Sequence, residues 1–232
     1  MTTETPSLLL VHGAWHGPWS WAALQPELGD ADVHTVALPS AGPDPRELGD
    51  LRADAAVIRD AVRAIDRPTV VVAHSYGGLP TTEALGGLPD VVGVIYLAAF
   101  VLDVGQSLTS AFTDGAPDWW DLHPEEGYVD ALRPKEIFYH DVEPATAAKC
   151  GALLAHHSLA AMGQPLTEAA WRHLPSSYVV CDQDRAIPPA AQEAMATRTG
   201  TVHHLPSSHS PFLSRPAELA ELIRRQTTAF LD

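Results

Sequence analysis

The sequence contains little cysteine and no long apolar run. Only two of its 232 residues are cysteines, Cys150 and Cys181, which predicts two free thiols in a reducing compartment rather than a disulfide-stapled scaffold. The spacing of the cysteines and histidines matches no metal-binding pattern. No apolar stretch approaches the roughly 20 residues of a membrane span, and residues 1–7 lack the order of a signal peptide. We therefore expect a cytoplasmic protein that holds no metal.

Basic residues are scarce as well. Lys and Arg together number 14 against 29 Asp and Glu, for a formal net charge of −15. A chain this acidic repels nucleic-acid backbones and anionic lipid surfaces, so we expect no nucleic-acid partner and no membrane partner. The length is that of one α/β domain with a substantial core. Nothing in the sequence indicates the number of subunits, and a homodimer stays open.

Short apolar runs alternate with helical patterns at both ends of the chain. Strands without an exposed face belong to a parallel sheet that is covered on both sides, so we predict an α/β fold with a mostly parallel central sheet and helices on both faces. The predicted strands are 7–11, 33–38, 69–73, 91–98, 177–181 and 201–205. The predicted helices are 20–28, 50–65, 79–85, 189–199 and 217–230.

The alternation is interrupted between residues 105 and 173. This segment contains Trp119, Trp120 and Trp171, several prolines and short helical stretches, without a convincing strand. We predict that it forms a small helical cap inserted into the core. The core then comprises residues 1–104 and 174–232, and the whole chain forms a single domain.

The most specific local signal is the stretch 73–78, Ala-His-Ser-Tyr-Gly-Gly, which lies between a predicted strand and a predicted helix. A serine at such a tight turn is exposed at the carboxyl end of the sheet. The N-terminus of the following helix favours negative charge that develops there. The usual pattern is Gly-x-Ser-x-Gly, and Ala73 adds only a methyl group to it. A simple packing turn is the plainer alternative, but this context favours Ser75 as a nucleophile.

A serine nucleophile needs a base, and the base needs an orienting acid. In sites of this type they follow the serine in the order acid, histidine. The loop after strand 177–181 offers two carboxylates, Asp182 and Asp184, and either could equally be a solvated turn residue. The loop after the last predicted strand contains His209. His209 is the candidate base, while spacing alone leaves the acid open between the two aspartates.

The loop after the first strand, residues 12–17, reads His-Gly-Ala-Trp-His-Gly. Acyl transfer requires an oxyanion hole, which consists of two backbone N–H groups aimed at one point. One donor is expected from Tyr76, the residue after the candidate nucleophile. The other is expected from Ala14 in this first loop.

Together these features resemble the α/β-hydrolase superfamily, and within it the branch of plant methyl esterases, hydroxynitrile lyases and related bacterial esterases. The resemblance extends over nearly the whole chain and rests on residues 11–17, 74–78, 96–100, Asp184 and His209. It implies that Asp184 rather than Asp182 is the acid. It also implies that Ala14 and Tyr76 are the oxyanion donors and that residues 105–173 are the cap that covers the pocket.

The resemblance implies a reaction as well. A Ser-His-Asp triad hydrolyses a small-molecule carboxylic ester through an acyl-enzyme intermediate, and it needs no cofactor. The substrate pocket should lie between the sheet and the cap. An aromatic lining would favour apolar or aromatic substrate groups, although each aromatic candidate could equally belong to the ordinary core. These candidates are Trp15, Phe100, Trp119, Trp120 and Tyr139.

Two other classes of function stay open. The same triad could serve a lyase, a cyclase, or an enzyme that acts on thioesters or lactones, because this fold supports many chemistries. Hydroxynitrile lyases carry a lysine after the catalytic histidine and a threonine in the first loop. This chain has Ser210 and Gly13 there, which argues against cyanohydrin cleavage. The non-enzymatic alternative is a ligand-binding, receptor-like module, which the presence of all three candidate triad residues disfavours.

Overall fold

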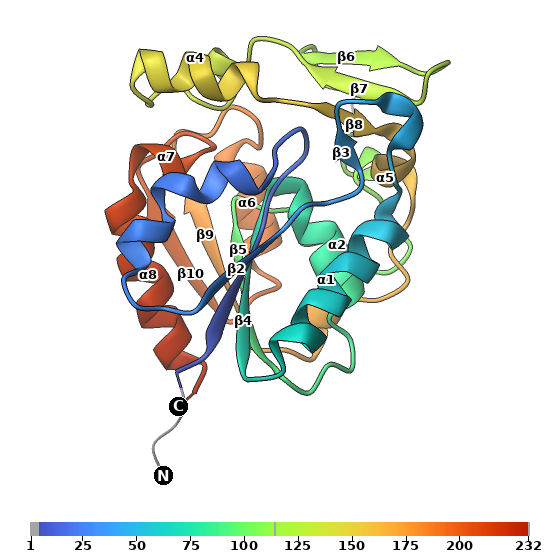
Figure 1. The fold of residues 1–232 in the computed structure, drawn as a ribbon. Coiled ribbons are helices and arrows are strands. Elements are labelled where there is room, and N and C mark those ends of the chain that lie inside the picture. The colour runs from blue at the N-terminus through green and yellow to red at the C-terminus, as the bar shows by residue number, and fades with distance from the viewer. Residues whose placement is uncertain (1–4, 114, 232) are drawn as a thin grey trace.

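The computed structural model describes residues 5–113 and 115–231. The central sheet is built from six strands: β1 (Ser7–Val11), β2 (Val33–Val36), β4 (Thr69–His74), β5 (Val91–Leu97), β9 (Ser176–Cys181) and β10 (Thr201–Leu205). Their order across the sheet is β10-β9-β5-β4-β1-β2, and each neighbouring pair is parallel. Helices flank both faces of this sheet (Figure 1). The predicted α/β fold with a parallel central sheet is confirmed.

The two faces of the sheet bury two separate apolar clusters. Successive side chains of a strand point to opposite faces, so Leu9 belongs to one cluster and its neighbour Leu8 to the other. The main helices are α1 (Leu51–Ile65), α2 (Gly78–Ala84), α6 (Pro189–Ala196), α7 (Pro211–Ser214) and α8 (Pro216–Ala229). The first cluster includes apolar side chains of α1, α2 and α6, and the second includes those of α8.

One predicted helix takes a different form. Residues 20–28 lie in two successive 3-10 helices, η1 (Pro18–Ala23) and η2 (Gln25–Leu28). Pro26 lies in the first turn of η2, and a proline has no backbone N–H with which to continue a helix across this point. The further 3-10 helices are η3 (Pro45–Glu47), η4 (Ser75–Gly77), η5 (Thr109–Ala111) and η6 (Ala170–Arg172).

The segment 105–173 contains strands, so the prediction of a helical segment without strands was wrong. Its strands are β6 (Trp120–His123), β7 (Tyr128–Ala131) and β8 (His156–Ser158), and its helices are α3 (Pro134–Ile137), α4 (Pro144–Ala152) and α5 (Leu159–Gly163). The strands form a second, antiparallel sheet in the order β3-β8-β7-β6 with the short strand β3 (Ala41–Gly42). Strands this short depend on pairing with a distant partner, which the local pattern does not reveal.

The second sheet lies across one end of the central sheet (Figure 1). That end carries the loops which follow β1, β4, β9 and β10, so the small sheet covers the region of the candidate site. The cap boundaries at residues 105 and 173 stay a prediction. Cys150 and Cys181 are both buried, free cysteines. Within the described residues, no helix is long and apolar enough to cross a bilayer.

Candidate active site

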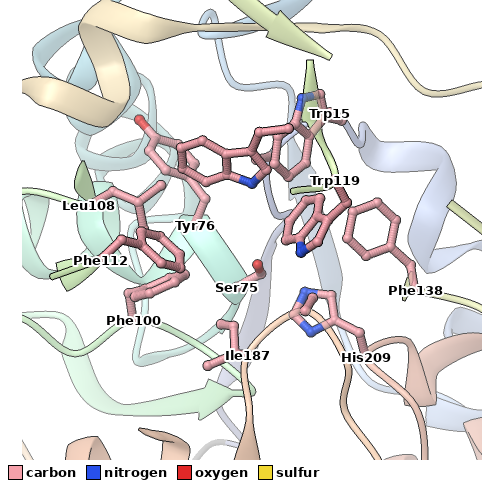
Figure 2. Close-up of a pocket in the computed structure, with 13 residues that line it drawn as sticks. Trp15, Ser75, Tyr76, Phe100, Leu108, Phe112, Trp119, Phe138, Ile187 and His209 are labelled. Atoms are coloured by element: carbon pink, nitrogen blue, oxygen red, sulfur yellow. The ribbon is translucent and has the colours of Figure 1, made fainter. Parts of the chain in front are cut away.

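Ser75 lies at the sharp turn between β4 and α2. It begins the single 3-10 turn η4 with a φ of +54°, a left-handed conformation that residues other than glycine rarely adopt. Strained backbone of this kind is concentrated at functional sites. The turn is held in place because the Phe100 N–H donates a hydrogen bond of 3.1 Å to the Ser75 carbonyl. The serine side chain points into a cavity at the end of the sheet (Figure 2).

The two glycines after the serine are required by close packing. A Cβ atom on Gly77 would lie 2.5 Å from the carbonyl oxygen of His12. A Cβ atom on Gly78 would lie 2.4 Å from the carbonyl oxygen of Phe100. The turn therefore approaches the backbone of the two neighbouring loops more closely than any larger residue permits. This approach places Ser75 beside the loop that follows β1.

His209 and Asp184 form a buried pair. Nδ1 of His209 lies 2.6 Å from Oδ2 of Asp184, and both side chains are almost fully buried. Asp184 follows β9, and His209 lies between β10 and α7. The His209 loop is also tied to β4, because Nε2 of His74 lies 2.9 Å from the His209 carbonyl and donates to it. The structure thus brings together residues that are 25 positions apart in the chain.

Asp184 is held in one orientation by four donors. Its Oδ1 accepts from the backbone N–H groups of Ala186 at 2.7 Å and Ile187 at 3.0 Å. Its Oδ2 accepts from Nε2 of Gln192 at 2.9 Å and from His209. A carboxylate has about four lone-pair positions, so its capacity is fully used. Gln192 is a buried residue of α6 that no motif in the sequence distinguishes, so it was not predicted.

Asp182, the alternative acid, lies elsewhere. Its side chain is exposed and accepts a hydrogen bond from Nδ1 of His204 at 2.8 Å. The strand end thus directs Asp182 toward solvent, while the following loop turns Asp184 inward to His209.

Four predicted site residues line one cavity. Ser75, His209, Ala14 and Tyr76 all contribute to its wall, and Figure 2 shows Ser75 and His209 facing one another across it. The cavity is small, about 20 Å³. Its remaining wall is apolar and mostly aromatic, and consists of Trp15, Phe100, Leu108, Phe112, Trp119, Trp120, Phe138, Ala186 and Ile187.

The predicted lining is therefore found for Trp15, Phe100, Trp119 and Trp120, and five further residues were missed. Two of these, Phe112 and Phe138, are aromatic residues of the segment 105–173. Their aromatic rings carry the same sequence signal as the tryptophans of this segment. Leu108, Ala186 and Ile187 carry no sequence signal that separates them from ordinary core residues.

Tyr139 does not line this cavity, so its assignment to the pocket was wrong. It is buried, and its hydroxyl lies 2.7 Å from Nε2 of His16. Nδ1 of His16 lies 2.7 Å from the carbonyl oxygen of Ala14. A carbonyl only accepts, so Nδ1 carries the proton and Nε2 accepts from Tyr139. Burial lowers the pKa of His16 to about 3, which keeps this imidazole neutral.

The loop after β1 is also held by the cap through Trp15. This residue has a φ of +62°, a backbone conformation that residues other than glycine rarely adopt. Its indole Nε1 donates to the Val129 carbonyl on β7 at 2.8 Å, and its own carbonyl accepts from the Ala155 N–H at 2.9 Å. The cap therefore supports the backbone of the first loop from the side opposite the central sheet.

Tyr76 is anchored by a buried carboxyl group. Its hydroxyl donates to Oδ2 of Asp54 on α1 at 2.7 Å, and the Ser40 N–H donates to Oδ1 at 2.9 Å. Burial raises the pKa of Asp54 to about 6. This contact fixes the residue after Ser75 to α1. Among the described residues, no three or more His, Cys, Asp or Glu side chains are grouped so that they could hold a metal ion.

Comparisons with known proteins place the chain in a family. A model described as the Alpha/beta hydrolase family matches residues 8–222. The chain is 30% identical over 242 residues to alpha/beta hydrolase nvfD of Aspergillus novofumigatus, covering 94% of this chain and 95% of the relative. It is 26% identical over 251 residues to Methylesterase 17 of Arabidopsis thaliana, covering 95% and 91%.

A solved structure shows the same fold. The crystal structure of a pyrethroid hydrolase from Sphingobium faniae JZ-2 matches with a TM-score of 0.83 and 24% identity, over 97% of this chain and 98% of that chain. The predicted resemblance to the superfamily and to its methyl esterase branch is confirmed.

Proposed function

This chain belongs to the α/β-hydrolase family, and we propose that it is a serine hydrolase that cleaves a small-molecule carboxylic ester. Ser75 is the proposed nucleophile, His209 the base and Asp184 the acid. The observation that carries the proposal is the buried 2.6 Å contact between His209 and Asp184, next to a cavity that Ser75 also lines. The methylesterase among its relatives supports an ester as the substrate.

The proposed reaction follows from the hydrogen bonds. Since Nδ1 of His209 donates to Asp184, Nε2 is left as the basic nitrogen. It removes the proton from Ser75 as the serine oxygen attacks the ester carbonyl, and Asp184 stabilises the imidazolium that forms. The N–H groups of Ala14 and Tyr76 hold the oxyanion, each contributing roughly 3–4 kcal/mol.

The second half of the reaction reverses these proton transfers. His209 protonates the leaving alcohol, and an acyl group remains on Ser75. Water then attacks the acyl-enzyme with His209 again as the base, and the acid is released. The apolar and aromatic lining of the cavity supports an ester whose groups beside the reacting carbon are apolar. The reaction as proposed uses no cofactor.

Hydrolysis of p-nitrophenyl acetate tests the proposal. We expect Ser75→Ala and His209→Ala each to lower kcat/KM by about 10³-fold or more. Ser177 is a buried serine on β9 that does not line the cavity, so Ser177→Ala is a matched control and should retain the parent rate. Turnover that survives both triad substitutions would refute the assignment. A folded parent that turns over no ester would favour a lyase or a binding role.

A further inference from the structure

The cavity beside Ser75 is too small to contain an ester. Its volume of about 20 Å³ has room for roughly one water molecule, whereas small-molecule sites commonly measure about 300–1,000 Å³. Aromatic rings occupy the space around it, including Phe112 and Trp119. A substrate whose carbonyl reaches Ser75 must therefore extend past the wall of the cavity.

A larger groove lies against that wall. Its volume is about 680 Å³, and its lining is mostly apolar. Part of the groove is formed by α6, through Ala191, Ala194 and Met195. Another depression of about 610 Å³, lined by Pro43 and His156 among others, shares no residue with the cavity. The cavity and the groove have five wall residues in common: Phe100, Phe112, Trp119, Ala186 and Ile187.

Phe112 is the least buried residue of the shared wall. The other four shared residues are buried, whereas Phe112 is only half-buried. Its ring packs edge-on against Phe100 at 5.9 Å and Trp120 at 5.2 Å between centroids. Figure 2 shows Phe112 and Phe100 together across the cavity from Phe138. A buried ring is confined by close packing, but a half-buried one can change rotamer toward solvent and join the two spaces.

We propose that the groove is the second compartment of the substrate site and receives the longer apolar arm of the ester, while the carbonyl lies at Ser75. This assignment rests on the proposed function, because it takes Ser75 as the reacting residue. The substrate class is then an ester with one extended alkyl or aryl arm. A short ester gains nothing from the groove, so chain length becomes the property that the groove selects.

Two arginines also line the groove, and both already have protein partners. The guanidinium of Arg198 donates to the Val101 carbonyl and lies over the Trp171 ring, 5.6 Å from its centroid. Arg185 donates to the Glu136 carbonyl at 3.4 Å. These contacts hold both guanidinium groups against protein atoms, and the apolar majority of the lining sets the proposed class of ligand.

Blocking the groove from α6 tests the proposal. Ala191 is exposed and lines the groove, while its neighbour Ala190 is exposed and does not. Ala191→Trp should therefore fill the groove, and Ala190→Trp is the matched control on the same helix. The rates are compared for methyl acetate, methyl octanoate and octyl acetate, of which only the last two carry a long arm. We expect Ala191→Trp to lower kcat/KM at least about tenfold for one or both of the esters with an eight-carbon chain, relative to the short ester.

The control, Ala190→Trp, should keep the kcat/KM ratios between the esters that the parent shows. Equal effects of Ala191→Trp on all three esters would overturn the proposal. A binding measurement separates this failure from failure of the proposed function. The Kd for 2-decanone, a ketone that cannot be hydrolysed, is measured by calorimetry in a Ser75→Ala background. Ala191→Trp should raise this Kd about tenfold, and Ala190→Trp should leave it unchanged.

The two readouts can disagree in an informative way. If ketone binding depends on Ala191 but no Ser75-dependent turnover is found, the groove is a ligand compartment and the proposed ester hydrolysis is wrong. If turnover depends on Ser75 but Ala191→Trp changes neither the kcat/KM ratios between the esters nor ketone binding, the role of the groove is wrong and the proposed hydrolase function stands. Absence of 2-decanone binding to the Ser75→Ala protein also rejects the groove.

Discussion

The hydroxyl of Tyr139 donates a hydrogen bond to Nε2 of His16 over 2.7 Å. Tyr139 belongs to the cap segment, and His16 lies in the loop after β1. The His16 ring also holds the first loop, because its Nδ1 donates a hydrogen bond to the carbonyl of Ala14 at 2.7 Å. Ala14 is the proposed oxyanion donor from this loop. A neutral, buried imidazole therefore connects the cap to the backbone that is proposed to stabilise the transition state.

Removal of the Tyr139 hydroxyl should impair catalysis more than binding. Tyr139→Phe leaves Nε2 of His16 as a buried acceptor without a donor, which costs about 1–3 kcal/mol and loosens the His16 ring whose Nδ1 holds the Ala14 carbonyl. We expect kcat for p-nitrophenyl acetate to fall about tenfold with little change in KM, because the oxyanion contact acts in the transition state.

Tyr96→Phe is the matched control for this substitution. The Tyr96 hydroxyl is also buried, and it pairs with the Thr82 hydroxyl at 2.9 Å. Tyr96 does not line the cavity. Both variants should lose some stability in denaturant, but only Tyr139→Phe should lower kcat. Equal losses of kcat in the two variants would show that the His16 contact has no particular catalytic role.

Exchange of the acid for an amide tests the choice between the two aspartates. Asp184→Asn keeps the size of the side chain, but its amide can donate to His209 and so favours the wrong imidazole tautomer. We expect kcat to fall by roughly 10³–10⁴-fold. Asp182→Asn alters only an exposed contact with His204 and should leave kcat near that of the parent. The reverse ranking in a steady-state assay would assign the acid to Asp182.

Buried histidines should make the protein sensitive to acid. His157 is fully buried, and its ring nitrogens have no hydrogen-bond partner among the described residues. Burial lowers its pKa from 6.5 to about 3. The unfolded chain therefore binds the extra proton below pH 6.5, while the folded protein does not. The stabilising contribution is complete above pH 6.5 and is lost as the pH falls toward 3.

Substitution of His157 isolates this contribution. Between pH 7 and pH 5 the parent should lose about 2 kcal/mol of unfolding free energy through His157, and His157→Leu should lose that much less. Urea titrations of both proteins at the two pH values measure the difference. An identical loss in parent and variant would show that His157 is protonated, or reaches solvent, in the folded state. Burial lowers the pKa of His12 to about 4, which acts in the same direction.

The sequence by itself determined the central sheet and the chain order of the candidate triad. Its central strands β4 and β5 are apolar along almost their whole length, so they had to be buried on both sides. Loops that follow parallel strands emerge at one end of a sheet. Ser75, Asp184 and His209 each follow such a strand, so their proximity could be predicted without coordinates. Gly77 and Gly78 were recognised by their motif, although their close contacts were not.

The tertiary structure alone decided the form of the cap and the direction of individual side chains. The strands of the cap have only three or four residues and pair in part with β3, which lies far away in sequence. Asp182 and Asp184 are equivalent by spacing, and only the path of the loop turns one outward and the other toward His209. The sequence shows Tyr139 only as an aromatic residue of the cap, whereas in the structure its hydroxyl fixes its position at His16. Such choices depend on non-local packing, which no short window of residues encodes.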